Sequence, residues 1–219
     1  MKFVAYYPYN ADVRNFNYPV QLAAQERGST ACDLLYAATK EEYTYSPENE
    51  PHISLNFTHR LAKVILKFVN MEKEPLEVSD VRIEGMQTAA SFNIQTDVLT
   101  VDESSVATIN PYHNATTGFY EAIILPSALT DSYKVSFVLD DREKEWIFTN
   151  LDIALPQFHK GYSYTFALYI DDSGFVEMGR LENVEGGNSS APWEDGSSED
   201  GTAEGDKTCL LYTSQSPRD

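Results

Sequence analysis

The four histidines are the residues best suited to metal binding or proton transfer, and they lie in separate segments. They are His52, His59, His113 and His159, and no two have the HxH or HxxxH spacing of a metal site. A metal or general-base role needs partners that converge, and the sequence indicates none. A packed or solvated structural histidine is the simpler interpretation of each. His59 differs, because it lies where a long apolar segment changes phase and its ring could hold a bend by hydrogen bonding.

The carboxylates that cluster in the sequence do not form a recognisable site. Asp140, Asp141 and Glu143 fall in an expected hairpin turn, and the ligand spacing of an EF-hand is absent, so a solvated turn is favoured over a calcium site. No GxSxG, GxGxxG, P-loop or HExxH pattern occurs. A glycosidase would need two carboxylates about 5 to 10 Å apart across a cleft, and no residues point to such a pair. We therefore expect no enzyme activity, no catalytic residues, no metal site and no cofactor.

Two other residue classes carry weaker signals. Cys32 and Cys209 are too few for a disulfide framework. Three triplets match the N-glycosylation sequon, which is frequent by chance; they begin at Asn56, Asn114 and Asn188. The chain has 14 tyrosines, and several near its start either form a sugar- or protein-binding surface or pack in cores and edges: Tyr6, Tyr7, Tyr9, Tyr43 and Tyr45.

The charge balance excludes some partners. The 219 residues include 34 acidic and 16 basic side chains, for a net charge of −18. Phosphates would be repelled, which argues against nucleic acid and anionic lipid as partners and favours solubility as the role of the charge. Eight acids and no Lys or Arg lie between Glu182 and Asp206, so much of the excess is in the tail. No run of about 18 apolar residues predicts a membrane-spanning helix, and no signal peptide is present.

The segment His52–Asn70 must position much of the rest. Its apolar residues lie at odd positions before His59 and at even positions after it, as in Val64, Leu66 and Phe68. Since neighbouring side chains of a strand point to opposite faces, this change predicts a break near His59–Ala62. At about 3.3 Å per residue the segment would span roughly 60 Å, long enough to serve two packed units. We expect the break to be the domain junction.

Other strands are expected at intervals of 10 to 15 residues, without a convincing helical stripe. They include 3–9, 18–22, 76–84, 89–94, 133–139, 146–148 and 162–170, with 33–38 as a strand or helical turn. Residues 98–101 and 106–109 are expected to pair as a hairpin, 110–118 to form a polar loop, and 120–125 to be covered on both faces. The pattern predicts an all-β, antiparallel β-sandwich architecture.

Several segments together resemble one family. In order they are AYYPYN (5–10), DLLYAATK (33–40), ISLNFTHRLAKVILKF (53–68), YEAIILPSAL (120–129), FHKGYSYTFALYI (158–170) and APWEDG (191–196). This order resembles the fimbrillin-like proteins of the Bacteroidetes, from Phe3 to Glu194. Each piece alone is weak, but the F-x-H-x-L-A-K segment makes the combination specific.

The resemblance implies a surface or fimbrial subunit built of two transthyretin-like β-sandwiches joined by one long strand. Such subunits are typically exported lipoproteins of the cell surface or outer membrane, and they act as stalk, tip or anchor in adhesion. Their partners would be other fimbrial subunits, joined by strand addition, and host or bacterial surface glycans or proteins. A carbohydrate-binding β-sandwich module is the alternative function that the residues leave open.

The resemblance and the pattern together give a domain division. We expect a partial N-terminal β-sandwich over 1–62, a C-terminal β-sandwich over 63–178, and an acidic Gly/Ser-rich tail over 179–208 with a short strand near Trp193. The family's lipobox and first strands are absent, and Met1 begins directly on a strand, so we expect the natural chain to start upstream. Residues 209–219, CLLYTSQSPRD, differ in composition from the tail and are interpreted as non-native, adapter-like residues.

Overall fold

Strands joined by turns account for the regular structure of the chain. The computed structural model describes residues 1–25, 32–44, 52–71, 77–147, 157–170, 176–181, 190–192 and 210–214, the last three ranges by their backbone only. Within these ranges there is no helix, and hence none that could span a membrane. The predicted all-β class is confirmed.

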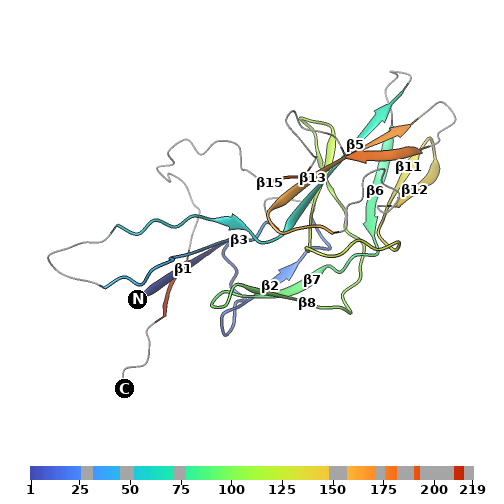
Figure 1. The fold of residues 1–219 in the computed structure, drawn as a ribbon. Helices are drawn as coiled ribbons and strands as arrows, with labels where there is room; N and C mark the ends of the chain where they lie inside the picture. Colours follow the sequence, from blue (N-terminus) through green and yellow to red (C-terminus); the bar gives the residue numbers. More distant parts are fainter. Residues whose placement is uncertain are drawn as a thin grey trace.

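The strands form four sheets in two layered units (Figure 1). The largest sheet contains β14 (Val176–Leu181), β13 (Tyr162–Ile170), β5 (Ala62–Asn70), β10 (Phe119–Ile124) and β9 (Tyr112–Asn114) in that order, with β15 (Ser190–Pro192) also paired to β13. It faces a sheet of β12 (Arg142–Ile147), β11 (Lys134–Leu139) and β6 (Val78–Glu84). We call this unit the C-terminal sandwich.

The second unit, the N-terminal sandwich, is smaller. One of its sheets contains β16 (Leu210–Ser214), β1 (Lys2–Tyr7), β3 (Leu35–Ala38) and β4 (Thr58–His59). The other contains β2 (Asn17–Gln21), β7 (Ala89–Asn93) and β8 (Val98–Val101). Side chains of both sheets share one buried cluster, including Tyr6, Tyr18, Leu34 and Phe92.

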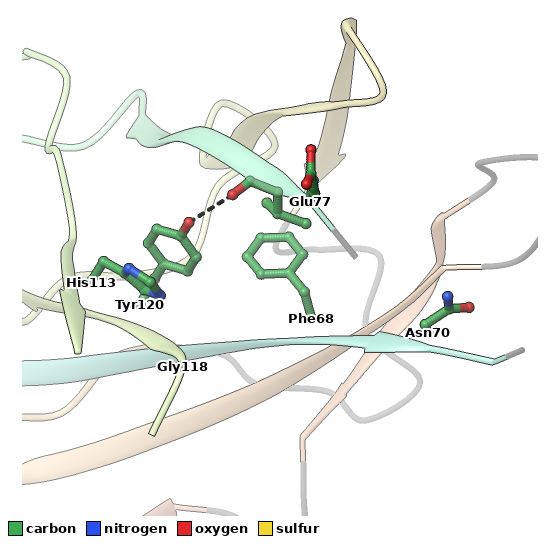
Figure 2. Close-up of a pocket in the computed structure, with 7 residues that line it drawn as sticks. Phe68, Asn70, Glu77, His113, Gly118 and Tyr120 are labelled. Carbon is green, nitrogen blue, oxygen red and sulfur yellow. Dashed lines mark hydrogen bonds between the residues drawn. The ribbon is translucent and has the colours of Figure 1, made fainter. Parts of the chain in front are cut away.

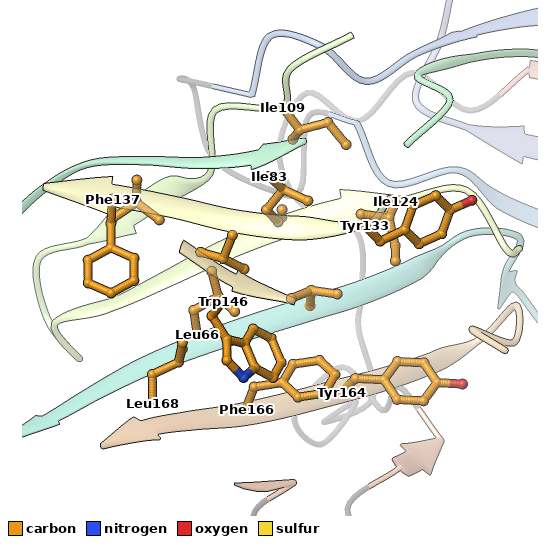
Figure 3. Close-up of a cluster of buried hydrophobic side chains, with 14 of the residues drawn as sticks. Leu66, Ile83, Ile109, Ile124, Tyr133, Phe137, Trp146, Tyr164, Phe166 and Leu168 are labelled. Carbon is orange, nitrogen blue, oxygen red and sulfur yellow. The ribbon is translucent and has the colours of Figure 1, made fainter. Parts of the chain in front are cut away.

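The core of the C-terminal sandwich follows from strand alternation (Figure 3). On β5 the even-numbered residues Val64 and Leu66 are fully buried, while Lys63 and Lys67 on the other face are only partly buried, as the sequence predicted. Trp146 of β12 packs across the layer on Phe166 of β13, with ring centroids 5.5 Å apart. Each fully buried aliphatic or aromatic side chain contributes about 1.5–3 kcal/mol of hydrophobic stabilisation.

The predicted break in His52–Asn70 is present, at Arg60 and Leu61 between β4 and β5. The expected strand before it is much shorter than predicted, since residues 52–57 are not in a strand and β4 has two residues. At the break, the His59 ring lies 2.9 Å from the Asp33 carboxylate, and both side chains are 8% exposed. The imidazole thus ties β4 to the segment that enters β3, the role expected of His59.

The sheets divide the chain differently from the expected boundary at 62 and 63. That boundary assigns β7 and β8 to the C-terminal sandwich, whereas β7 pairs with β2, with Tyr18 opposite Phe92. Phe92 and Ile94 are buried in the N-terminal core. Hydrogen bonding between distant segments decides this division, so no contiguous cut of the sequence reproduces it.

Strand β10 belongs to both cores, which confirms the prediction that its two faces are covered. Ala122 and Ile124 lie in the core of the C-terminal sandwich. Ile123, and Leu125 directly after the strand, lie in the core of the N-terminal sandwich. Buried Gln25 completes the joint: its amide donates to the Ile123 carbonyl at 2.6 Å, and its carbonyl accepts from the Ile123 amide at 2.7 Å. One side chain thereby replaces a neighbouring strand along this part of β10.

Three local predictions are corrected. β5 and β13 run parallel, the one parallel pair among the described strands, because β13 returns to β5 from a distant part of the chain. The predicted hairpin of 98–101 with 106–109 is wrong: β8 pairs with β7, while Val106 and Ile109 bridge to Gln87 and Ile83. Residues 110–118 are not wholly loop, since they contain β9.

The tail contains more strand than the sequence indicated. β14 continues to Leu181, past the point where polar tail was expected, whereas β15, just before Trp193, lies where a short strand was expected. β16 falls within the residues that were interpreted as non-native, and it pairs with β1. Most of the acidic tail lies outside the described residues.

Candidate functional site

The outer edge of β1 is the first candidate site. Phe3 forms two hydrogen bonds with Thr39 beyond β3: the Thr39 amide donates to the Phe3 carbonyl at 2.9 Å, and the Phe3 amide donates to the Thr39 hydroxyl at 3.1 Å. Alternate residues of an antiparallel strand direct their backbone groups to opposite sides. Val4 therefore directs its amide and carbonyl away from β3, toward the edge.

That edge is covered by β16 of the same chain (Figure 1). The two strands are antiparallel and in register over five pairs, from Lys2 opposite Ser214 to Tyr6 opposite Leu210. About 200 residues separate the partners in sequence, and β16 has no other strand neighbour among the described residues. The edge thus accepts an extended segment as an added strand.

The edge of β2 is built differently. Asn17 forms two backbone hydrogen bonds with Arg14 on the side away from β7, and the Leu22 amide donates to Thr88 on the side of β7. Alternation then places Pro19 with its missing amide on the outer side. Proline on an edge strand prevents a further strand from pairing. β1 has no proline from Lys2 to Tyr7, so its edge lacks this protection.

The second candidate site is a pocket of about 420 Å³ at the open end of the C-terminal sandwich, which we call the mouth pocket (Figure 2). The larger sheet and its β9–β10 turn supply five of its residues, and the segment entering β6 supplies two. They are Phe68, Asn70, His113, Gly118 and Tyr120, and Glu77 and Val78.

Aromatic contacts fix the floor of the mouth pocket. The Tyr120 hydroxyl donates to the Val78 carbonyl at 2.9 Å, which holds the ring between the two sheets. The exposed His113 ring stacks on Tyr120 with centroids 4.6 Å apart and planes 23° apart. Phe68 meets Tyr120 edge-on at 5.7 Å and Phe137 of the core at 4.8 Å. Burial raises the pKa of Tyr120, so its phenol stays neutral and able to donate.

The remaining histidines do not converge. His52 is exposed, and His59 is paired with Asp33 in the N-terminal sandwich. His159 contacts the Gln157 amide at 2.9 Å and the ring of Tyr162. Among the described residues, no three His, Cys, Asp or Glu side chains lie close enough together to hold a metal ion.

The turn carboxylates, and the two sequons that fall in the described part of the chain, occupy ordinary places. Asp140 and Asp141 have φ of 48° and 59° and form the two-residue turn of the β11–β12 hairpin, as expected for a turn. Asn56 is exposed, and the Asn114 amide donates to Glu121 at 3.0 Å. Asn188 lies outside the described residues.

The four early tyrosines that the structure describes do not form one binding surface. Tyr6 is fully buried and meets Tyr18 edge-on at 5.5 Å, so it belongs to the core. Tyr7 and Tyr43 are half-buried, and Tyr9 is 52% exposed. Tyr45 lies outside the described residues. Sequence reasoning missed the mouth pocket, because Phe68 and Tyr120 fit the alternation of buried strand residues and gave no separate signal.

Two solved bacterial structures are similar in fold to this chain. A cell adhesion candidate from Bacteroides uniformis is 24% identical, with a TM-score of 0.69 over 83% of this chain and 72% of that one. Another from Bacteroides ovatus is 16% identical, with a TM-score of 0.62 over 83% and 68% of the two chains. A comparison with curated proteins found no match. The model of the fimbrillin-like family matches residues 1–193, which is most of the sequence. The chain therefore belongs to the fimbrillin-like family.

Proposed function

We propose that the chain is a noncatalytic structural or adhesive subunit of a bacterial cell-surface fimbria, and that subunits join by strand addition at the outer edge of β1. Family membership supports the fimbrial role. The observation that carries the assembly mode is the seating of β16 on β1 over five registered pairs. Backbone hydrogen bonds supply the affinity of such an added strand, and side chains at alternate positions supply its specificity.

The energetics favour an occupied edge. An uncovered strand without proline exposes unpaired amides and carbonyls and pairs with any suitable chain. The segment LLYTS is extended and uncharged, and the edge accepts it although it lies within the residues interpreted above as non-native. A strand from a neighbouring subunit would form the same backbone contacts. In this proposal the subunit is exported to the outer membrane as a lipoprotein, and its main partners are further fimbrial subunits.

The experiment displaces β16 in the full chain. Tyr212 lies opposite Val4, and Tyr212→Pro removes the amide at that position. We expect the variant to bind a labelled peptide of residues 208–216 in fluorescence anisotropy and to self-associate in light scattering. Adding Val4→Pro should abolish both effects, whereas adding Glu42→Pro, in an exposed connection, should leave them unchanged.

Two results would overturn the assembly proposal. One is a folded Tyr212→Pro variant that stays monomeric and binds no peptide. The other is equal peptide binding with and without Val4→Pro, which would locate the peptide elsewhere. Circular dichroism of each variant shows whether its sheets are intact.

A further inference from the structure

We propose that the mouth pocket binds a neutral pyranose sugar, of one or two rings, as a site separate from the assembly edge. Its volume of about 420 Å³ falls within the range of about 300–1,000 Å³ that small-ligand pockets occupy. Its lining combines aromatic rings with an amide, a carboxylate and an imidazole. A sugar ring has the matching surfaces, since one face carries C–H groups and the edges carry hydroxyls.

His113 supplies an aromatic face for that ring. One face of the imidazole covers Tyr120, and the exposed side chain lines the pocket, so its uncovered face is accessible from solvent. The electron-rich face of an aromatic ring attracts the positively polarised C–H groups of a flat partner. Tyr120 lies next to His113, and Phe68 extends the apolar floor on the far side of Tyr120 (Figure 2).

Two polar side chains also line the pocket. Glu77 is exposed directly before β6, and Asn70 is half-buried at the end of β5. A carboxylate accepts hydrogen bonds, an amide both donates and accepts, and a neutral imidazole does one of each at its two nitrogens. This set suits hydroxyl groups, which also donate and accept.

Charge narrows the class of sugar. Glu77 is the one charged residue that lines the described pocket, and the chain as a whole carries a net charge of −18. Acidic sugars and phosphates would be repelled by both. A neutral hexose fits, whereas sialic acid and uronic acids do not.

The pocket is preformed, because contacts within the protein hold its aromatic side chains in place. Tyr120 lies on β10, which is paired with β5 and β9, and its hydroxyl is bonded to Val78 across the sandwich. Phe68 is wedged between Tyr120 and Phe137. The site lies at the carboxyl end of β5, far from β1 (Figure 1). A subunit joined to others through β1 would therefore still present it.

The test is ligand-observed NMR on the monomeric full chain with lactose, maltose and sialyllactose. Lactose has the terminal galactose common on host glycans, and maltose represents glucose polysaccharides. We expect saturation transfer to at least one neutral disaccharide, and titration should give a Kd of about 1–10 mM. We expect no saturation transfer to the sialic acid residue of sialyllactose. Loss of one stacked ring weakens such binding roughly three- to tenfold, which we expect of His113→Ala. Glu77→Gln should reduce the discrimination against sialyllactose.

The control is Tyr9→Ala, which removes an exposed aromatic ring outside the pocket and should leave binding unchanged. His113 and Glu77 are exposed, so their variants test binding without loss of the fold. Absence of transfer to both neutral sugars at about 10 mM would overturn the proposal. Equal affinity of His113→Ala and the wild type for the sugar would also overturn it. So would slower hydrogen exchange of the pocket residues in the assembled protein than in the monomer, because a neighbouring subunit would then cover the pocket.

Discussion

At the scale of single residues, the contact between His59 and Asp33 has the clearest energetic role. Both side chains are 8% exposed and their polar atoms are 2.9 Å apart, so neither is well solvated. A buried hydrogen bond of this kind is expensive to break from one side, because the remaining polar group keeps its desolvation cost. The contact holds the end of β4 against the entry to β3, where the long segment breaks.

We therefore predict that His59→Leu lowers the free energy of unfolding by about 2–4 kcal/mol. The double variant His59→Leu, Asp33→Leu should lose less than the sum of the two single changes, because both partners are then apolar. Urea denaturation measures all of these values. His52→Leu is the control, since His52 is exposed and its loss should cost less than about 0.5 kcal/mol. Additive effects of the two single changes would contradict the coupling.

The residue types and their spacing gave no signal for a metal site, and they gave none for the mouth pocket either. The spacing of the histidines gave no metal site, and among the described residues they lie apart. His113, however, was indistinguishable in sequence from a solvated histidine. Its stacking on Tyr120 comes from the pairing of β9 with β10, in which the two residues are directly opposite.

At the scale of elements, turns are where backbone conformation restricts the sequence. Gly85 follows β6 with φ of +86°, and a Cβ added there would lie 2.0 Å from the Ser132 carbonyl oxygen. Gly118, in the β9–β10 turn, has φ of +73° but open space around the same position. The two glycines share a left-handed conformation and differ in their surroundings.

This pair gives a matched test. Gly118→Ala should cost about 1–2 kcal/mol, the penalty of a left-handed alanine. Gly85→Ala should cost more than about 3 kcal/mol, because the backbone of Ser132 must also move. Thermal denaturation of the two variants measures the difference, and similar losses of stability would show that the turn yields to a methyl group.

Strand β5 is the element on which the C-terminal sandwich depends. Val64 is fully buried and lies opposite Ala122 of β10 and Tyr164 of β13. Because β5 has a hydrogen-bonded strand on each side, Val64→Pro removes a ladder bond wherever the amide points. We predict that this variant lowers the free energy of unfolding by more than about 3 kcal/mol and unfolds the C-terminal sandwich.

Tryptophan fluorescence follows that unfolding, because Trp146 is buried in this core. Glu42→Pro, in an exposed connection, is the control and should leave the melting curve unchanged. An unchanged melting curve for Val64→Pro would refute the assignment of β5 as a central strand.

At the scale of the whole molecule, the two sandwiches share β10, and two hydrogen bonds from Gln25 to Ile123 connect them further. We predict a single cooperative unfolding transition for the wild type, since residues of one strand lie in both cores. Gln25→Leu removes both hydrogen bonds to Ile123. It should lower the stability by about 2–4 kcal/mol and separate the transitions of the two units.

Differential scanning calorimetry distinguishes one transition from two. Gln95→Leu serves as the control, because Gln95 is exposed and its loss should leave the transition unchanged. A Gln25→Leu variant that unfolds in one step at the wild-type temperature would show that apolar contacts alone join the sandwiches.

Alternation of apolar and polar residues determined the all-β class, most strand positions and the break at Arg60 and Leu61, and a nearly continuous apolar run determined the two covered faces of β10. These are local properties, because the direction of a side chain depends only on its place along the strand. The tertiary structure alone decided that β7 pairs with β2, that β5 and β13 are parallel, and that β16 covers β1. It alone also formed the mouth pocket. Each joins segments far apart in the chain, and hydrogen bonding between backbones leaves no mark on the residue types that form it.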